Sequence, residues 1–380
     1  MPLPSKPHIL FFVTEDWYFL SHRMGLARAM MEAGYDVSLI TQVDKGAAEI
    51  EAAGIHLYPL HIKRSGMNLW RELKTFLRIA RIYQKARPDI VHHVALKPVV
   101  YGSLAARLVG ITRRVNALAG LGFVFSSNSW RARLIKPVVT LLLLIALSGK
   151  KARLIVQNAD DVSFFKNKKL APASSIRLVR GAGVDPSRFV VQQENLEQKP
   201  LIVLPARLLQ DKGVGELVEA ARKIIKEKGA LARFALVGAP DLQNPASFTP
   251  AQVESWEKEG IVECWGWRED MSEVFASANI VCLPSYREGL PKALLEAAAC
   301  GRAIVTCDVP GCREIVQDGE NGWLVPARDA AALAKALIQA IENSDLRARY
   351  AKYSRKLIEE VFAEKYIYEQ TLAVYSEIQS

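Results

Sequence analysis

The stretch IVCLPSYREGLPKALLEAAACGRAIVTCD, residues 280–308, holds a strand, a turn, a helix and a second strand in that order. The apolar runs at its two ends are short, which is typical of buried parallel strands. Pro291 suits the first turn of the helix, where its missing N–H costs nothing. The stretch therefore predicts a β–α–β unit within a parallel sheet.

The same alternation of strand-like and helix-like runs fills the rest of the chain. It pauses at VVQQENLEQKP, residues 190–200, which is polar, lacks an apolar period and is typical of a linker. A chain of 380 residues is also too long for one ordinary domain. We therefore expect an α/β protein of two doubly wound domains, with ligands at the carboxyl ends of the strands and a cleft between the domains.

Composition narrows the class of protein. Half of the residues are hydrophobic and 24% are charged, so a core can form and a disordered chain is not expected. The five cysteines are odd in number and form no CxxC, which indicates free thiols in a reducing compartment. The short polar start runs directly into a strand-like segment, so no signal peptide is expected.

Positive charge is concentrated in the first part of the chain. Residues 1–150 carry 20 lysines and arginines against 9 aspartates and glutamates, a net of +11, whereas the remainder is nearly neutral. Nucleic acid, an anionic membrane surface, a phosphorylated lipid and plain solubility are alternative reasons. The apolar run at 138–149 is shorter than the roughly 20 residues that span a bilayer. It indicates either a buried helix or a helix lying at a membrane face.

Two short motifs in the second half suggest a nucleotide site. Arg207 and Lys212 follow a strand and precede a glycine-containing helix start, and cations beside a helix N-terminus suit a diphosphate. Gly266, between two tryptophans, lets backbone approach a flat base closely. The ordinary alternatives are surface cations and a simple turn. GLGF (120–123) and GAGVD (181–185) leave the dinucleotide fingerprint incomplete, so NAD is not expected.

Glu288 and Glu296 are the candidate carboxylates of the opening stretch. They could form a general acid and base pair, or they could each hold sugar hydroxyls. The N–H groups from Gly289 to Lys292 can point at the oxygens of a ligand. A glutamate stabilising the helix dipole would explain Glu296, but it would not explain the position of Glu288.

Residues 284–325, PSYREGLPKALLEAAACGRAIVTCDVPGCREIVQDGENGWLV, resemble the signature of the family-four retaining glycosyltransferases, whose core is two glutamates with seven residues between them. ARLLQDKG resembles the phosphate-binding Arg and Lys of that family, and GAGVDPSRF its entry to the second domain. The resemblance implies a GT-B fold, with two Rossmann-like domains facing a cleft. The acceptor domain would be 1–190, the nucleotide-sugar domain 191–357, and 358–380 a helix crossing back to the first.

Three further segments, IKRSGMN, PDIVHHVALKP and NALAGLGFVF, resemble the branch that extends polyprenyl-diphosphate-linked sugars in bacterial capsule, O-antigen and N-glycan assembly. That branch implies transfer of a hexose or N-acetylhexosamine from a UDP-sugar, such as UDP-GalNAc or UDP-GlcNAc, to an undecaprenyl-diphosphate-linked sugar. The UDP-sugar is a co-substrate, and no cofactor, metal or nucleic acid is implied. The protein would work at the inner face of the cytoplasmic membrane, held there by its basic first domain.

The resemblance also implies roles for single residues. Arg207 and Lys212 would neutralise the diphosphate, Glu296 would hold the ribose, and backbone at Gly266 and Trp267 would meet the base. Glu288, with the turn formed by Gly289, Leu290 and Pro291, would hold the donor sugar and diphosphate, which makes Glu288, Arg207 and Lys212 the catalytic candidates. The candidate contacts to the acceptor are Arg23, Arg64, Lys97 and His93.

The chain departs from the family pattern at two places. TEDWYF (14–19) stands where many members carry a Gly-Gly pair, and Ala119 stands where many carry a histidine that contacts the donor sugar. Two other classes of function remain as alternatives. One is a sugar-nucleotide epimerase on a similar fold, which would have no need of both glutamates. The other is a nucleic-acid binder, although the cations of this chain are not interleaved with aromatic residues.

Overall fold

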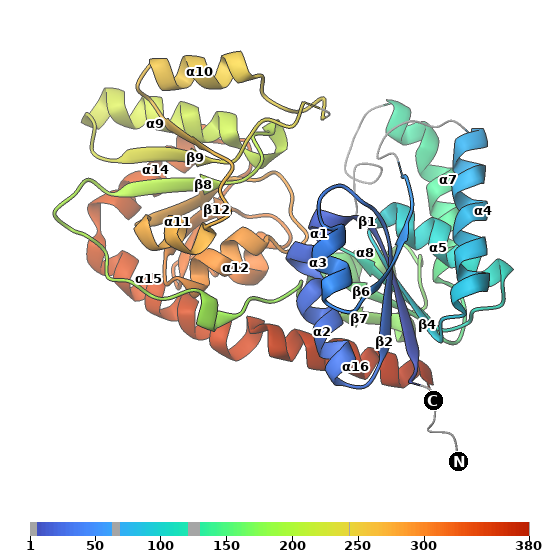
Figure 1. The fold of residues 1–380 in the computed structure, drawn as a ribbon. Coiled ribbons are helices and arrows are strands. Elements are labelled where there is room, and N and C mark those ends of the chain that lie inside the picture. The colour runs from blue at the N-terminus through green and yellow to red at the C-terminus, as the bar shows by residue number, and fades with distance from the viewer. Residues whose placement is uncertain (1–5, 63–68, 121–129, 243, 380) are drawn as a thin grey trace. The chain divides into compact units, whose positions relative to one another are not determined.

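The computed structural model describes residues 6–62, 69–120, 130–242 and 244–379 (Figure 1). Contacts divide the chain into an N-terminal unit, Met1–Ala182 with Ile367–Ser380, and a C-terminal unit, Gly183–Tyr366. The sequence placed these boundaries at 190/191 and 357/358. The first boundary lies earlier because Val184 and Phe189 already pack in the core of the C-terminal unit.

The N-terminal unit is built on a seven-stranded sheet in the order β3-β2-β1-β4-β5-β6-β7, with every neighbouring pair parallel. Its first six strands follow the Rossmann order. Strands β2 and β3 are added on one side of β1, and the strands from β4 onward are added on its other side, so the strand order reverses between β1 and β4. The strands are β1 (His8–Glu15), β2 (Asp36–Gln42), β3 (His56–Pro59), β4 (Ile90–Val94), β5 (Arg114–Leu118), β6 (Ala152–Val156) and β7 (Ile176–Leu178).

Helices cover both faces of this sheet, so the apolar side chains on both sides of β1 are buried. Phe11 packs with α2 (Met24–Glu32) and α16 (Glu364–Gln379), whereas Leu10 and Phe12 pack with α4 (Leu69–Ala86) and α5 (Leu96–Leu108). The helices are α1 (Asp16–His22), α2 (Met24–Glu32), α3 (Ala47–Ala52), α4 (Leu69–Ala86), α5 (Leu96–Leu108), α7 (Trp130–Leu147), α8 (Ala159–Asn167) and the short 3-10 turns η1 (Ala173–Ser175) and η2 (Pro186–Arg188), the last belonging to the C-terminal unit.

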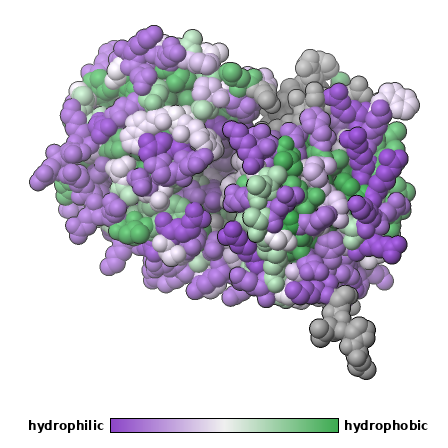
Figure 2. Space-filling model, viewed as in Figure 1, coloured by the Kyte–Doolittle hydropathy of each residue, from purple (hydrophilic) through white to green (hydrophobic). Residues whose placement is uncertain are grey.

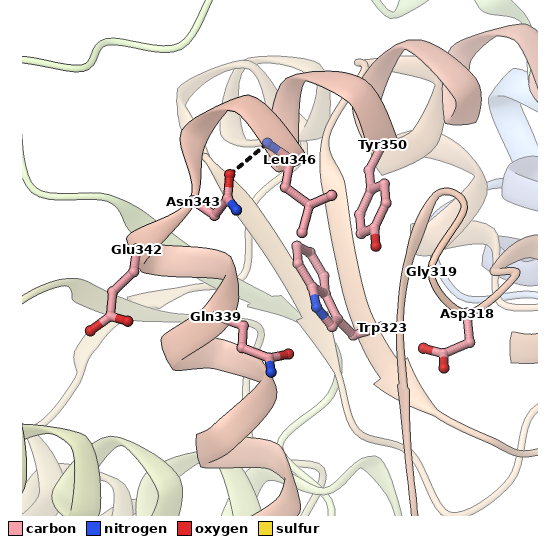
Figure 3. Close-up of a pocket in the computed structure, with 8 residues that line it drawn as sticks. All are labelled: Asp318, Gly319, Trp323, Gln339, Glu342, Asn343, Leu346 and Tyr350. Carbon is pink, nitrogen blue, oxygen red and sulfur yellow. Dashed lines mark hydrogen bonds between the residues drawn. The ribbon is translucent and has the colours of Figure 1, made fainter.

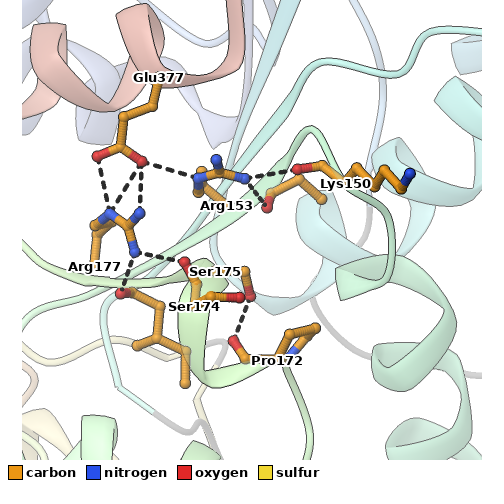
Figure 4. A network of polar contacts seen from close by, with 9 residues as sticks. Lys150, Arg153, Pro172, Ser174, Ser175, Arg177 and Glu377 are labelled. Atoms are coloured by element: carbon orange, nitrogen blue, oxygen red, sulfur yellow. Dashed lines mark hydrogen bonds and ion pairs between the residues drawn. The ribbon is translucent and has the colours of Figure 1, made fainter.

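The last helix, α16 (Glu364–Gln379), joins the N-terminal unit, as the sequence predicts. Its buried face packs under the sheet through Ile367, Tyr375 and other apolar residues. Its Glu377 carboxylate accepts hydrogen bonds from Arg153 on β6 at 3.0 Å and from two nitrogens of Arg177 on β7 (Figure 4). The helix is therefore attached both by apolar burial and by ion pairs.

The C-terminal unit repeats the Rossmann order on six parallel strands, β10-β9-β8-β11-β12-β13. Its strands are β8 (Leu201–Pro205), β9 (Arg233–Val237), β10 (Glu263–Gly266), β11 (Ile280–Leu283), β12 (Ala303–Cys307) and β13 (Gly322–Val325). Its helices are η3 (Gln210–Lys212), α9 (Val214–Lys228), α10 (Pro250–Lys258), α11 (Met271–Ser277), α12 (Lys292–Ala299), α13 (Cys312–Ile315), α14 (Ala330–Glu342), α15 (Ser344–Leu357) and the π-helical turn η4 (Ile358–Phe362).

The visible surface is largely hydrophilic, as expected for a chain that buries its apolar residues in a core. Figure 2 shows hydrophilic residues over most of the visible face, with hydrophobic ones scattered among them.

All five cysteines are free, as predicted, and burial raises the pKa of Cys300 to about 11 and that of Cys307 to about 12. These thiols are therefore protonated and unreactive at neutral pH.

Candidate functional site

The turn after β8 presents a helix N-terminus at the carboxyl edge of the C-terminal sheet. The fully buried strand β8 ends at Pro205, and Arg207 and Lys212 follow before α9 begins. Gly213 is the residue before the helix and has a left-handed φ of 71°. The first N–H groups of α9 and the positive end of its dipole are thus available to an anion.

A second turn carries Glu288 to the same edge of the sheet. It follows β11, the strand next to β8 across the reversal of strand order, where doubly wound sheets bind their ligands. The structure corrects one expectation here, because Pro291 precedes the helix and does not lie in its first turn. Its ψ of 113° is extended, and its carbonyl accepts the N–H groups of Leu294 and Leu295.

The two turns fit against each other so closely that glycine is required. A Cβ at Gly213 would lie 2.1 Å from the carbonyl oxygen of Pro284 in the second turn. The N–H of Tyr286 donates to the carbonyl of Asp211 at 2.9 Å, which ties the turns together. A third turn, after β12, is packed as tightly, since a Cβ at Gly311 would lie 2.4 Å from the Gly289 oxygen.

The candidate cations and carboxylates of these turns are paired. Lys212 Nζ donates to Glu288 Oε1 at 2.5 Å, and the Glu288 side chain is only 12% exposed. The structure thus brings together two of the three catalytic candidates. Arg207 pairs with Asp241, which follows β9, at 2.7 Å. Asp241 was missed by sequence reasoning because it lies 34 residues away in a loop without a distinctive motif.

Glu296 lies on α12, with its side chain 13% exposed and 3.3 Å from Lys292 Nζ. Burial raises the pKa of this carboxyl, and the nearby charges of Lys292 and Arg188 oppose the rise. Arg188, in the short turn at the start of this unit, was not among the predicted residues. The site thus holds the second glutamate nearly out of water with cations beside it.

Gly266 and Trp267 lie at the end of β10, two strands from β8. Gly266 has a φ of 68°, and its carbonyl accepts the N–H of Gly238 at 2.8 Å. A Cβ at Gly238 would lie 1.9 Å from the oxygen of Ala206, so the ends of β8, β9 and β10 are joined by close backbone contacts. The side chain of Trp267 is exposed.

Tyr286 supports the turn that carries Glu288, and sequence reasoning missed it. Its hydroxyl donates to Glu216 Oε1 in the first turn of α9 at 2.5 Å. The guanidinium of Arg328 lies over its ring, 4.6 Å from the centroid, and Arg328 itself has a φ of 64°. Burial and the neighbouring carboxylate raise the pKa of Tyr286, so its hydroxyl keeps the proton it donates.

The described candidate acceptor residues Arg23 and Lys97 belong to different elements of the N-terminal unit. Arg64 lies outside the described residues. Lys97, in the first turn of α5, pairs with Glu72 at 3.0 Å and lies over the ring of Tyr101. Arg23 precedes α2 and is buried, and its Nε has no hydrogen-bond partner among the described residues. Contact of these residues with an acceptor stays a prediction.

His93 is sealed inside the sheet. It has no exposed surface, and its ring nitrogens bond Asn116 Oδ1 at 2.8 Å and Tyr83 Oη at 2.9 Å. Burial lowers its pKa to about 3, so the ring is neutral. The adjacent His92 points to the other face and bonds Tyr375 of α16. The geometry favours a structural role for both histidines, and an acceptor role for His93 stays a prediction.

Two known families match the chain. "Glycosyl transferases group 1" matches residues 199–343, a segment that contains both glutamates, and "Glycosyl transferase 4-like" matches residues 8–158. The chain therefore holds a group 1 glycosyltransferase domain and a glycosyltransferase 4-like domain, and it is a glycosyltransferase. The epimerase alternative is thereby excluded in favour of a glycosyltransferase.

Two curated relatives of this glycosyltransferase have names that describe transfer to a sugar linked to undecaprenol through a diphosphate. One is the N,N'-diacetylbacillosaminyl-diphospho-undecaprenol α-1,3-N-acetylgalactosaminyltransferase of Campylobacter jejuni, which is 29% identical over 92% of this chain and 96% of its own length. Another is the UDP-Gal:α-D-GlcNAc-diphosphoundecaprenol α-1,3-galactosyltransferase of Escherichia coli, 21% identical over 85% and 84%. These names describe the relatives themselves.

Solved structures share the fold over nearly the whole chain. Sucrose-phosphate synthase from Thermosynechococcus elongatus has a TM-score of 0.82 at 18% identity, covering 98% of this chain and 99% of the other. HepE of Anabaena, solved with UDP and glucose, has a TM-score of 0.76 at 17% identity, covering 97% and 99%. With two sheets in Rossmann order, this likeness confirms the GT-B fold.

Proposed function

We propose that this glycosyltransferase moves a hexose or an N-acetylhexosamine from a UDP-sugar to a sugar carried on undecaprenyl diphosphate. The single observation that carries the proposal is the contact between Lys212 and Glu288 at the reversal point of the C-terminal sheet. A lysine side chain suits phosphate oxygens and a carboxylate suits sugar hydroxyls, so this pair would fit the diphosphate and sugar of one nucleotide-sugar. The named activities of the two lipid-sugar transferases support the substrate class.

Arg207 and Lys212, with the N-terminus of α9, would take up the negative charge that develops on the departing UDP. Both cations are paired with carboxylates, so a diphosphate would compete with or share Asp241 and Glu288. We propose that these cations and the helix dipole neutralise the leaving group without a metal ion. Removal of divalent cations by a chelator should then leave the rate unchanged, whereas a metal-dependent enzyme would lose its activity.

Glu296 would accept hydrogen bonds from the ribose hydroxyls, and backbone near Gly266 and Trp267 would face the base. Glu288 and the N–H groups of Gly289 and Leu290 would hold the donor sugar. A nearly buried carboxylate bonds strongly to a pair of hydroxyls, which suits both glutamates.

We further propose transfer with retention of configuration at the sugar. The bond from the sugar C1 to the UDP oxygen breaks, and the acceptor oxygen forms a new bond to C1 on the same face. The acceptor proton passes to the β-phosphate oxygen of the departing UDP. A covalent sugar adduct trapped on a carboxylate of the enzyme would contradict this route.

The test is an assay of UDP release with UDP-GalNAc, UDP-GlcNAc and UDP-Gal, each with and without an undecaprenyl-diphosphate-linked sugar. We expect release with one donor class only when acceptor is present, and a product heavier by one sugar. Failure of every UDP-sugar to react with any lipid-linked acceptor would refute the proposal.

Two neighbouring helices of the N-terminal unit expose apolar side chains. On α4 the exposed side chains include Trp70, at 77%, and Leu77. On α7, Leu134, Val138 and Leu141 follow one another at helical spacing and are also exposed, while Leu143 and Leu147 pack inward, so this helix is not fully buried. Both helices pack beside α5 (Figure 1).

The same two helices also carry exposed basic side chains, including Lys74 and Arg78 on α4 and Arg133 and Lys136 on α7. Within the described part of the chain, no helix has both the length and the apolar character to cross a membrane. Apolar side chains together with cations suit a helix lying at an anionic lipid surface. We propose that α4 and α7 bind the enzyme to such a surface.

Flotation with vesicles tests this surface. The triple variant Leu134→Ser, Val138→Ser, Leu141→Ser should float less with anionic vesicles than the parent protein. The matched control Val190→Ser, Leu242→Ser removes exposed apolar side chains of the C-terminal unit and should float normally. Equal loss in both variants would contradict a specific role for α7.

A further inference from the structure

A pocket of about 570 Å³ lies at the edge of the C-terminal unit, between β13, α14 and α15 (Figure 3). This volume falls within the range of roughly 300–1,000 Å³ typical of small-molecule sites. Trp323 and Tyr350 form its inner wall, with their ring centroids 4.7 Å apart. Gln339, Glu342 and Asn343 line its outer part. The proposed roles in sugar transfer make no use of this pocket.

The pocket lies at the amino ends of the strands, whereas the donor site lies at their carboxyl ends. Asp318 precedes β13 and Trp323 is its second residue, so both are at the amino end of that strand. The turns that carry Lys212 and Glu288 follow the carboxyl ends of β8 and β11. Since all six strands are parallel, these are opposite edges. A ligand in the pocket would not compete with a nucleotide-sugar.

An unpaired donor faces this pocket. The Trp323 side chain is only 8% exposed, and its Nε1 donates to no acceptor among the described residues. Figure 3 shows the indole nitrogen on the side of the ring that faces Gln339. This nitrogen is not fully buried, so water can reach it from the pocket and a ligand oxygen could replace that water. An oxygen of a bound ligand beside Gln339 would accept this N–H.

The charges around the pocket are largely matched within the protein. Glu342 pairs with Lys228 at 3.2 Å, and Asp318 Oδ1 accepts the N–H of Leu324 at 2.9 Å. Asn343 Oδ1 accepts the N–H of Leu346, which leaves its amide nitrogen as a donor. No lysine or arginine is among the described residues that line the pocket. The remaining groups are therefore amide and indole donors and carboxylate oxygens, a set that suits hydroxyl groups and disfavours phosphate.

We propose that this pocket binds a neutral sugar unit, as a second carbohydrate site separate from the donor site. Trp323 Nε1 donates to a ring or hydroxyl oxygen of the sugar, and Gln339 and Glu342 bond its neighbouring hydroxyls. The aromatic wall and Leu346 contact its apolar C–H face. This proposal does not rest on the donor or the acceptor proposed above.

The experiment follows the indole N–H signals of the full-length protein by NMR, and the variant Trp323→Phe identifies the signal of Trp323. Methyl α-N-acetylgalactosaminide and lactose serve as probes, with and without saturating UDP. We expect the Trp323 signal to shift saturably with a sugar and to do so equally when UDP is present. No shift with either sugar up to about 50 mM would overturn the proposal. A shift that UDP abolishes would also overturn it, because the sugar would then bind at the donor site.

A second variant keeps the test independent of folding at Trp323. Gln339→Ala with Glu342→Ala changes two exposed side chains and should weaken sugar binding at least about tenfold. The matched control Glu197→Ala with Gln198→Ala changes an exposed acid and an exposed amide in the linker and should leave sugar binding unchanged. A trilysine peptide that shifts the Trp323 signal where sugars do not would refute the neutral-sugar assignment.

Discussion

Gly213 and Gly215 provide a matched pair of substitutions two residues apart. At Gly213 the φ of 71° is left-handed, which costs a residue with a Cβ about 1–2 kcal/mol. The new Cβ would also lie 2.1 Å from the Pro284 oxygen, so backbone must move by about 1 Å, a displacement that can cost about a hundredfold in rate. At Gly215, in the first turn of α9, the nearest atom is Phe248 Cζ at 3.5 Å, an ordinary contact.

The two variants should therefore behave oppositely. Gly213→Ala should lower the melting temperature by about 2–8 °C, weaken UDP binding and slow sugar transfer about a hundredfold. Gly215→Ala leaves the backbone N–H groups in place and should gain up to about 1 kcal/mol of stability, because alanine loses less backbone freedom on folding than glycine does. Thermal unfolding, calorimetric titration with UDP and the UDP-release assay measure these effects. The reasoning is refuted if Gly213→Ala melts and transfers like the parent protein.

Three further outcomes are expected. Tyr286→Phe removes the hydroxyl that donates to Glu216. The activation free energy of transfer should rise by about 1–2 kcal/mol, while the melting temperature hardly changes. An unaltered transfer rate would show that this hydrogen bond does not position the turn. His93 becomes protonated below about pH 6.5 in the unfolded chain but only near pH 3 in the folded protein. As the pH falls through this range, this side chain should lower the free energy of unfolding by about 1.4 kcal/mol per pH unit. His93→Gln should reduce that slope when thermal unfolding is measured at several pH values. Glu377→Gln weakens the partly exposed pairs to Arg177 and its neighbour on β6 and should cost about 1 kcal/mol of stability, measured by thermal unfolding, with a smaller loss at high salt.

Local patterns in the sequence were sufficient to predict the α/β class and the alternation of strands and helices, whereas the roles of the site residues stay predictions. The apolar runs predict the parallel strands. Glu288 and Glu296 are eight residues apart, which puts Glu288 in the turn after β11 and Glu296 on the following helix, α12. Lys212 also has its position set by the strand and glycine around it. The family resemblance then supplied the GT-B arrangement, because strand order and strand reversal cannot be read from periodicity alone.

Contacts between distant segments were beyond sequence reasoning. Asp241 reaches Arg207 and Glu216 reaches Tyr286 only because β8, β9 and β11 are neighbours in the folded sheet. His93 looked like a residue at a strand end, yet the helices above the sheet cover it completely. Burial by later segments of the chain has no local signal in the sequence.

The central claim is that Glu288 and Glu296 hold two ends of one nucleotide-sugar, and one comparison of variants tests it directly. Calorimetric titration with UDP and the transfer assay are applied to Glu296→Gln and Glu288→Gln. We predict that Glu296→Gln weakens UDP binding at least about tenfold. Glu288→Gln should bind UDP almost normally yet lose most of its transfer activity. Loss of UDP binding in Glu288→Gln, with normal UDP binding in Glu296→Gln, would contradict the account.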